Sequence, residues 1–170
     1  MKMSATEIPR VFLGTPSLLT PEQQSELERW VAWLERRPCD VVRLGRDSYG
    51  DDPWRVLTRL LSHADGVLLL GFRQLDARTA VWRPDTKEEA PSAAWWTSPW
   101  LQLEAGMAVA LGLPVLVAPE AEVEDGAFHP DVWGTHVNGT ALGDAPGATA
   151  DDWLKAVRAH WTRRTTPDPA

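Results

Sequence analysis

The sequence contains very little cysteine. Cys39 is the single cysteine among 170 residues. One thiol excludes a disulfide bond within the chain and any site in which several thiolates bind a metal ion. A chain without disulfide bonds suits a reducing compartment, so we expect the protein to be cytoplasmic.

Long apolar runs and an excess of positive charge are also lacking. The best candidate for a membrane span, segment 103–119, is interrupted by Glu104 and Pro114, and the first ten residues do not resemble a signal peptide. Lysine and arginine together number 17 against 24 aspartates and glutamates, a formal net charge of −7. Because binding to a nucleic-acid backbone calls for a basic surface, the sequence predicts neither membrane insertion nor nucleic-acid binding.

Several cofactor-binding and catalytic motifs are missing as well. The chain has no GxGxxG and no GxxxxGK[ST], and Ser48 stands one residue too late for the GxSxG elbow of hydrolases. The histidines at positions 63, 129, 136 and 160 are not spaced as metal ligands are, and no cysteines accompany them that could complete a metal site. We therefore expect no metal site and no resident cofactor. These absences disfavour a conventional dinucleotide oxidoreductase, a P-loop enzyme and a serine hydrolase.

Short apolar strands alternate with amphipathic helices along the chain. The pattern predicts strands at 11–13, 41–44, 66–71 and 115–118, with a fifth near 135–137, and helices at 21–37, 53–63, 99–112 and 151–163. Continuously apolar strands are typical of a parallel sheet that is covered on both faces. We predict an α/β fold, a flavodoxin-like or Rossmann-like three-layer sandwich with a parallel sheet of four or five strands and helices on both faces.

The predicted elements fit one domain, residues 1–164, followed by a flexible tail at 165–170. The regular alternation is interrupted at 74–97, a polar stretch that holds Trp82, Trp95 and Trp96 and that we interpret as an inserted tryptophan-rich loop. In sheets of this kind ligands bind beyond the carboxyl ends of the strands, at the topological switch point. The loops at 14–17, 46–52, 72–98 and 119–129 are therefore the candidates for a binding site.

Glu104 is the residue that departs from the apolar pattern of its helix. At about 100° per residue, Glu104 lies about 40° from Trp100 on the helical wheel, on the face that also carries Met107 and Leu111. An ionised carboxylate on an apolar face is costly, so it is usually paired, protonated or used in chemistry. The structural alternative is a glutamate that accepts hydrogen bonds from the backbone of a neighbouring loop.

The segments 64–70, 98–108 and 111–117 together resemble the core of the nucleoside 2-deoxyribosyltransferases. The spacing of Ser98, Trp100 and Glu104 is also similar to that in TIR and TIR-like domains, which cleave the nicotinamide–ribose bond of NAD. Three features depart from these families. Ser98-Pro99 replaces the usual Gly-Thr before the helix, no equivalent of the second active-site acid is found, and the stretch 74–97 is longer than either family leads us to expect.

The resemblance implies chemistry at an N-glycosidic bond, with Glu104 as the catalytic carboxylate. Breaking the bond between a ribose C1′ and a base nitrogen develops positive charge on the sugar, and a carboxylate can stabilise that charge or form a covalent glycosyl intermediate. NAD, a nucleoside monophosphate and a deoxynucleoside all remain open as substrates, NAD being a substrate and not a cofactor. Hydrolysis and transfer to another base also remain open.

Further residues are candidates for binding the substrate. Gly14, Thr15 and Ser17 follow the first strand, where they suit a phosphate or ribose or form a simple turn with Pro16. The remaining candidates are Asp65 for a sugar hydroxyl, Phe72 and Ser98 at the ends of the 72–98 loop, Trp96 and Trp100 (with Trp82 and Trp95) for stacking on a base, and, with less support, Arg46, Asp47 and His129. Each has a structural alternative, such as a turn, a loop anchor or a solvated surface residue.

Three functions thus compete. The first is an N-glycosidase or a deoxyribosyltransferase-like enzyme that acts on a small nucleotide or nucleoside. The second is a sensor that binds a nucleotide without turnover, and the third is a TIR-like interaction module. The resemblance also makes a homodimer or a larger homo-oligomer plausible.

Overall fold

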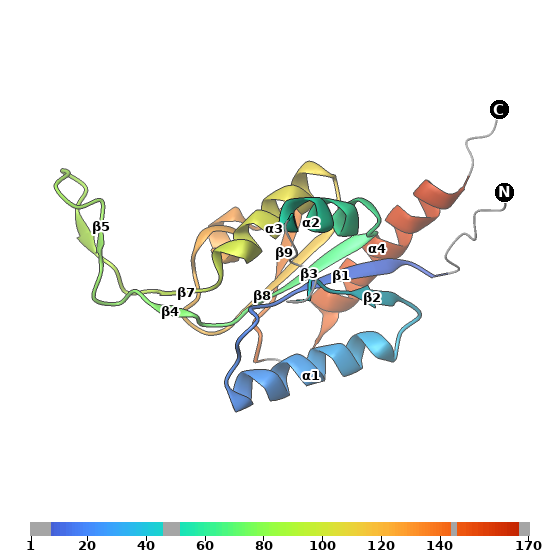
Figure 1. The fold of residues 1–170 in the computed structure, drawn as a ribbon, viewed down its shortest axis with the longest axis horizontal. Helices are drawn as coiled ribbons and strands as arrows, with labels where there is room; N and C mark the ends of the chain where they lie inside the picture. Colours follow the sequence, from blue (N-terminus) through green and yellow to red (C-terminus); the bar gives the residue numbers. More distant parts are fainter. Residues whose placement is uncertain (1–7, 46–51, 144–145, 167–170) are drawn as a thin grey trace.

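The computed structural model describes residues 8–45, 52–143 and 146–166 of the chain. Its centre is a five-stranded parallel sheet in the order β2-β1-β3-β8-β9. The strands are β1 (Arg10–Gly14), β2 (Asp40–Val42), β3 (Gly66–Gly71), β8 (Val115–Pro119) and β9 (Val137–Gly139). Helices cover both faces, so the predicted flavodoxin-like three-layer α/β sandwich is confirmed (Figure 1).

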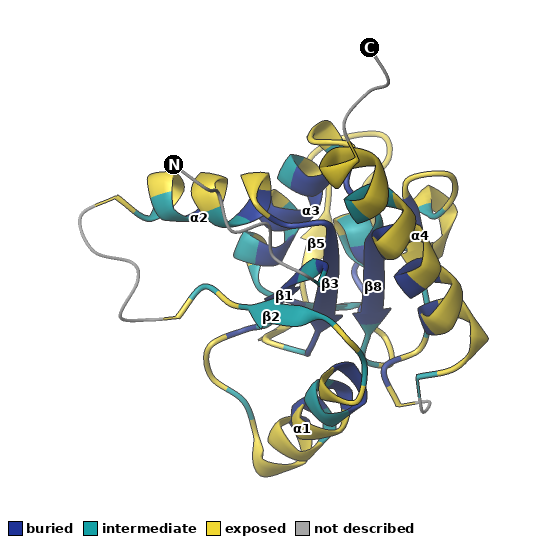
Figure 2. Ribbon diagram, turned by 90° about the vertical axis from the view of Figure 1, so that its right-hand side faces the viewer, coloured by how far each residue is buried: buried dark blue, intermediate teal, exposed yellow. Residues whose placement is uncertain are grey.

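Four helices form the two outer layers. They are α1 (Pro21–Glu35), α2 (Pro53–Ser62), α3 (Pro99–Ala110) and α4 (Ala148–Thr165). Helices α1 and α4 pack on one face of the sheet, and α2 and α3 pack on the other. Figure 2 shows the result: the central strands β3 and β8 are buried, and the outer faces of the helices are exposed.

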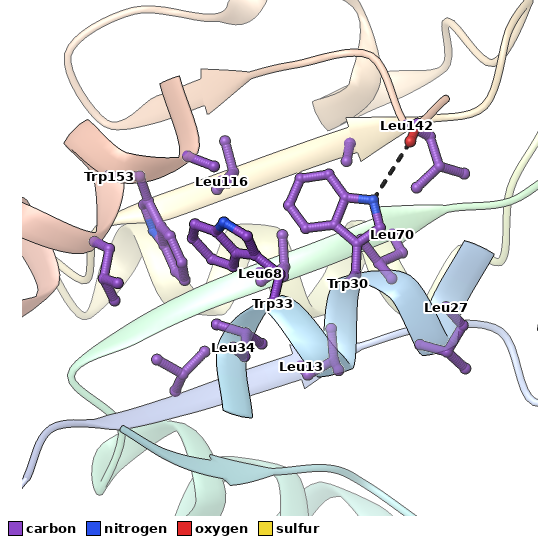
Figure 3. Packing of buried hydrophobic residues seen from close by; sticks show 14 of the residues in the cluster. Leu13, Leu27, Trp30, Trp33, Leu34, Leu68, Leu70, Leu116, Leu142 and Trp153 are labelled. Atoms are coloured by element: carbon purple, nitrogen blue, oxygen red, sulfur yellow. Dashed lines mark hydrogen bonds between the residues drawn. The ribbon is translucent and has the colours of Figure 1, made fainter. Parts of the chain in front are cut away.

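The layer between the sheet and the α1/α4 pair is filled by large side chains. Trp30 and Trp33 of α1 and Trp153 of α4 meet over Leu68 and Leu116 of the sheet (Figure 3). Both fully buried indoles keep a hydrogen bond: Trp30 Nε1 donates to the carbonyl of Leu142 at 3.4 Å, and Trp153 Nε1 donates to that of Pro114 at 3.1 Å. A buried indole N–H without a partner costs free energy, and both of these indoles have one.

Each of the first three helices begins where the sequence placed a cap and a proline. Thr20, Asp52 and Ser98 each accept a backbone hydrogen bond at the helix start, and a proline occupies the first turn each time. Helix α4 instead follows Gly147, which has no side chain to cap the helix, and it begins at Ala148, three residues before the predicted start. It also continues to Thr165, whereas the sequence predicted a tail from that residue on; residues 167–170 lie outside the described part.

The stretch 74–97 is an arm and not an irregular loop. It contains two short antiparallel ladders, β4 (Leu75–Asp76) with β7 (Trp95–Trp96) and β5 (Val81–Trp82) with β6 (Ala90–Pro91). Figure 1 shows that this arm projects away from the sheet beyond the carboxyl ends of its strands. Each strand is only two residues long, too short for an alternating pattern to mark it in the sequence.

None of the helices in the described part combines the length and the hydrophobicity that a membrane crossing requires.

Candidate active site

A cavity of about 650 Å³ lies at the switch point of the sheet. It opens between the carboxyl ends of β1 and β2 and the first turns of α1 and α3, which approach from opposite faces. This is the crevice where ligands bind in open α/β sheets. The lining includes Gly14, Thr15, Ser17, Thr20, Gln24, Arg43, Ser98, Trp100 and Glu104.

Glu104 is buried at the inner end of this cavity. Helix α3 starts at Pro99 behind the Ser98 cap, so Glu104 falls in the second turn, on the side that faces the sheet. The side chain is only 4% exposed, and its Oε2 has no hydrogen-bond partner among the described residues. Burial raises the pKa of Glu104 from its ordinary value of 4.5 to about 8. The structural alternative, in which neighbouring backbone groups bind the carboxylate, is therefore not observed at this oxygen.

Gly14 makes room for that carboxyl group. A Cβ at this position would overlap Oε2 of Glu104 and would lie 2.6 Å from Leu69 Cδ2. Any other residue at the end of β1 would therefore displace Glu104 or the core beside it. Gly14 therefore ends a buried strand and also leaves the space that the Glu104 carboxyl group occupies.

The rest of the lining combines leucine side chains with hydroxyl groups, one indole and one guanidinium. Thr15, Ser17 and Ser98 bring three hydroxyl groups to the cavity, and Arg43, just after β2, adds a guanidinium. Partial burial lowers the pKa of Arg43 from its very high ordinary value. Sequence reasoning missed Arg43, although its place directly after a parallel strand is a usable signal.

An aromatic pair stands beside the cavity. The ring of Trp100, which lines the cavity, packs on Trp54 of α2 at 5.2 Å between centroids, with the planes inclined by 44°. Trp54 is 52% exposed, which leaves much of its surface free for a ligand. Trp54 is not among the residues that the sequence singles out, because nothing along the chain links positions 54 and 100.

Asp65 lies at the opposite edge of the sheet, and its predicted role with a sugar hydroxyl is corrected. It precedes β3, so it stands at the amino end of the strand. Its Oδ2 accepts the backbone N–H of Arg10 at 2.8 Å, and its Oδ1 pairs with Arg164 of α4 at 2.9 Å. Asp65 therefore ties β1 and α4 together, which is a structural role other than the turn or helix end that its sequence position suggests.

Phe72 and Trp96 do not line the Glu104 cavity either. Phe72 is fully buried in the core under α1 and faces a second cavity. Trp96 belongs to the arm, where its ring packs on Trp82 at 5.4 Å, and His129 stands beside the same two rings. The other weaker candidates, Arg46 and Asp47, lie outside the described residues. Within 8–45, 52–143 and 146–166, no three His, Cys, Asp or Glu side chains are grouped so that they could hold a metal ion.

Comparisons with known proteins give structural neighbours only. No protein-family model and no curated protein matches the chain. Among solved structures, it is similar to the Clostridium botulinum CMP N-glycosidase BcmB (14% identity, TM-score 0.47, covering 86% of this chain and 96% of that one). It is also similar to the Francisella novicida lysine decarboxylase LdcF (13%, 0.47, 90% and 17%) and to a prokaryotic SEFIR domain (17%, 0.40, 95% and 98%). At such identities and TM-scores, the assignment of the site rests on its own geometry.

Proposed function

We propose that this protein cleaves, or transfers a group at, the N-glycosidic bond of a nucleotide or nucleoside, with Glu104 as the catalytic residue. The observation that carries the proposal is a buried carboxyl group, unpartnered at Oε2, at the inner end of the switch-point cavity. Strongly perturbed acids in a cleft are candidates for catalysis, because a fold rarely retains an uncompensated buried carboxyl group without a use for it.

The chemistry follows from what the carboxylate can do at C1′ of a sugar. As the bond from C1′ to the base nitrogen breaks, its electron pair leaves with the base, and positive charge builds on the ribose ring. The Glu104 carboxylate either stabilises this charge or attacks C1′ to form a glycosyl ester. Water or a second base then takes the glycosyl group, which gives hydrolysis or transfer respectively.

Because Glu104 is buried, ionising it is unfavourable in the empty site and becomes favourable when a cationic sugar lies beside it in the transition state. With a pKa of about 8, Glu104 is mainly protonated at pH 7, and ionising it costs about 1.4 kcal/mol for that one unit. A cationic sugar placed beside it in an apolar surround repays this cost, because the attraction is strongest where water is excluded. The interaction is thus stronger in the transition state than in the ground state, which is the requirement for catalysis.

The other lining residues suit the parts of such a substrate. We assign the hydroxyl groups of Thr15, Ser17 and Ser98 to the sugar hydroxyls, and the exposed face of the Trp54–Trp100 pair to the planar base. Arg43 supplies positive charge for a phosphate when the substrate is a nucleotide. Phe72, Trp96 and Asp65 have no part in this arrangement.

A nucleotide sensor is the second candidate, and one observation favours it. Among the described residues that line the cavity, Glu104 is the single carboxyl-bearing side chain. A neutral base leaves more readily when an acid protonates it, so a site with one acid also suits binding without turnover.

The test is to incubate the purified protein with NAD, with nucleoside monophosphates and with deoxynucleosides, and to measure released base by chromatography. The proposal predicts release from one of these classes and its loss in Glu104→Gln. The matched control is Glu28→Gln, which removes an exposed acid from the outer side of α1. Equal release by Glu104→Gln contradicts the proposal, and binding of a nucleotide without any release supports the sensor.

A further inference from the structure

A second and larger cavity, of about 970 Å³, lies beyond the carboxyl ends of β3 and β8. It is bounded by the first turns of α1, by Pro119 at the end of β8 and residues 120–124 after it, and by residues 141–143 after β9. Among the described residues, Thr20 alone lines both this cavity and the Glu104 cavity. Its volume is that of a typical small-molecule site, and the proposed glycosidic chemistry does not use it.

The charged groups around this cavity are nearly all negative. Among the described residues that line it, five are glutamates and one is an arginine: Glu22, Glu26, Glu120, Glu122, Glu124 and Arg73. The arginine is already engaged, because its Nε donates to the carbonyl of Ala121 at 2.8 Å and its guanidinium pairs with Glu122 at 3.1 Å. The lining therefore repels an anionic ligand and attracts a cation.

The inner surface of the same cavity is aromatic. Trp95 and Trp133 line it with partly exposed rings, and the fully buried Phe72 and Phe128 lie behind its surface. The guanidinium carbons of Arg73 and Arg78 lie 5.4 and 4.9 Å from the centroid of the Trp95 ring, so this ring already makes cation–π contacts within the chain. Its indole N–H is buried without a partner among the described residues, which leaves a donor for a bound molecule to satisfy.

The geometry points to a binding site for an organic cation with a flat or apolar body, separate from the Glu104 cavity. The aromatic walls hold the body of the ligand, and the glutamates at the rim balance its positive charge. Aromatic surfaces combined with carboxylates select ammonium groups in this way because both attract positive charge, and a quaternary ammonium group keeps its charge because it has no proton to lose.

The site is tested with three probes of similar size and different charge. Calorimetric titration compares benzyltrimethylammonium, neutral benzyl alcohol and anionic benzoate on the wild-type protein. The cation is expected to bind at least about 10-fold more tightly than the alcohol, and benzoate is expected not to bind. Equal affinity for the cation and the alcohol, or no binding of the cation at millimolar concentration, overturns the proposal.

Variants then locate the site. The pair Glu122→Gln and Glu124→Gln changes two exposed side chains and is expected to weaken cation binding about 5-fold or more, with benzyl alcohol unaffected. The control pair Glu28→Gln and Asp152→Asn makes the same change in net charge at exposed positions outside this cavity and is expected to have no effect. An equal loss in the control pair, or loss of cation binding in Glu104→Gln, contradicts the proposed location.

Discussion

Replacing Glu104 with glutamine removes a titratable group whose pKa burial raises from 4.5 to about 8. In the unfolded chain the group returns to its ordinary pKa. Between these two values the native state keeps a proton that the unfolded state has released. Stability of the wild-type protein therefore falls as the pH rises through this window, whereas the Glu104→Gln variant lacks this contribution.

The size of the effect follows from the shift. With about 1.4 kcal/mol per pKa unit, Glu104 lowers the free energy of unfolding by about 1 kcal/mol at pH 5, about 3 kcal/mol at pH 7 and about 5 kcal/mol at pH 9. The comparison across pH cancels any constant difference in packing between glutamate and glutamine. The change between pH 5 and pH 7, about 2.5 kcal/mol, is thus the quantity to measure.

This change in the free energy of unfolding is measured by urea unfolding at pH 5, 7 and 8.5. The proteins compared are the wild type, Glu104→Gln and Glu28→Gln. Glu104→Gln is expected to gain stability relative to the wild type by about 2.5 kcal/mol between pH 5 and pH 7. Glu28→Gln is expected to follow the wild type, because residue 28 is exposed. Parallel profiles for the wild type and Glu104→Gln would refute the reasoning, since the carboxyl group would then ionise in the folded protein as it does in water.

Three further predictions rest on the same geometry. Because the ionised carboxylate is the reactive form, kcat/KM is expected to rise about tenfold per pH unit up to about pH 8 and then to level off, and a fall over this range contradicts the role given to Glu104. Gly14→Ala is expected to cost about 1–3 kcal/mol of stability by overpacking and to abolish turnover, whereas the control Gly106→Ala, on an open face of α3, is expected to stabilise the protein by about 1 kcal/mol; equal unfolding midpoints for the two variants would contradict the tight contact at Gly14. Asp65→Asn is expected to lose about 1–3 kcal/mol of stability and to leave kcat/KM of the folded protein unchanged, and a change in kcat/KM at full stability would return Asp65 to the site.

The fold and Glu104 were predictable because each rests on a periodic signal. The buried run from Gly66 to Gly71 has the length and composition of a central parallel strand, and the wheel position of Glu104 among apolar residues marked a carboxyl group that turns inward. In the sequence, Thr20 and Ser98 each precede a proline, which is the usual pattern of a helix start, at the two helices that border the cavity. Local chemistry determines all of these features, so one sequence is enough to find them.

The errors and omissions have physical reasons as well. Asp65 was placed in the site although it precedes its strand, and parallel strands bring only the residues that follow them to the binding edge. The contact between Trp54 and Trp100 joins two helices that are far apart in sequence, and no pattern along the chain encodes such a contact. The arm was interpreted as a loop because its strands are two residues long.

The central claim is that the carboxylate of Glu104 acts on a glycosidic bond. The most direct measurement is the rate of base release at saturating substrate by the wild type and by Glu104→Gln, with substrate binding measured in parallel. The account predicts that the substitution lowers the rate by about 1,000-fold or more and changes the dissociation constant by less than about tenfold. A rate that survives the substitution, in a protein that still binds its substrate, would contradict it.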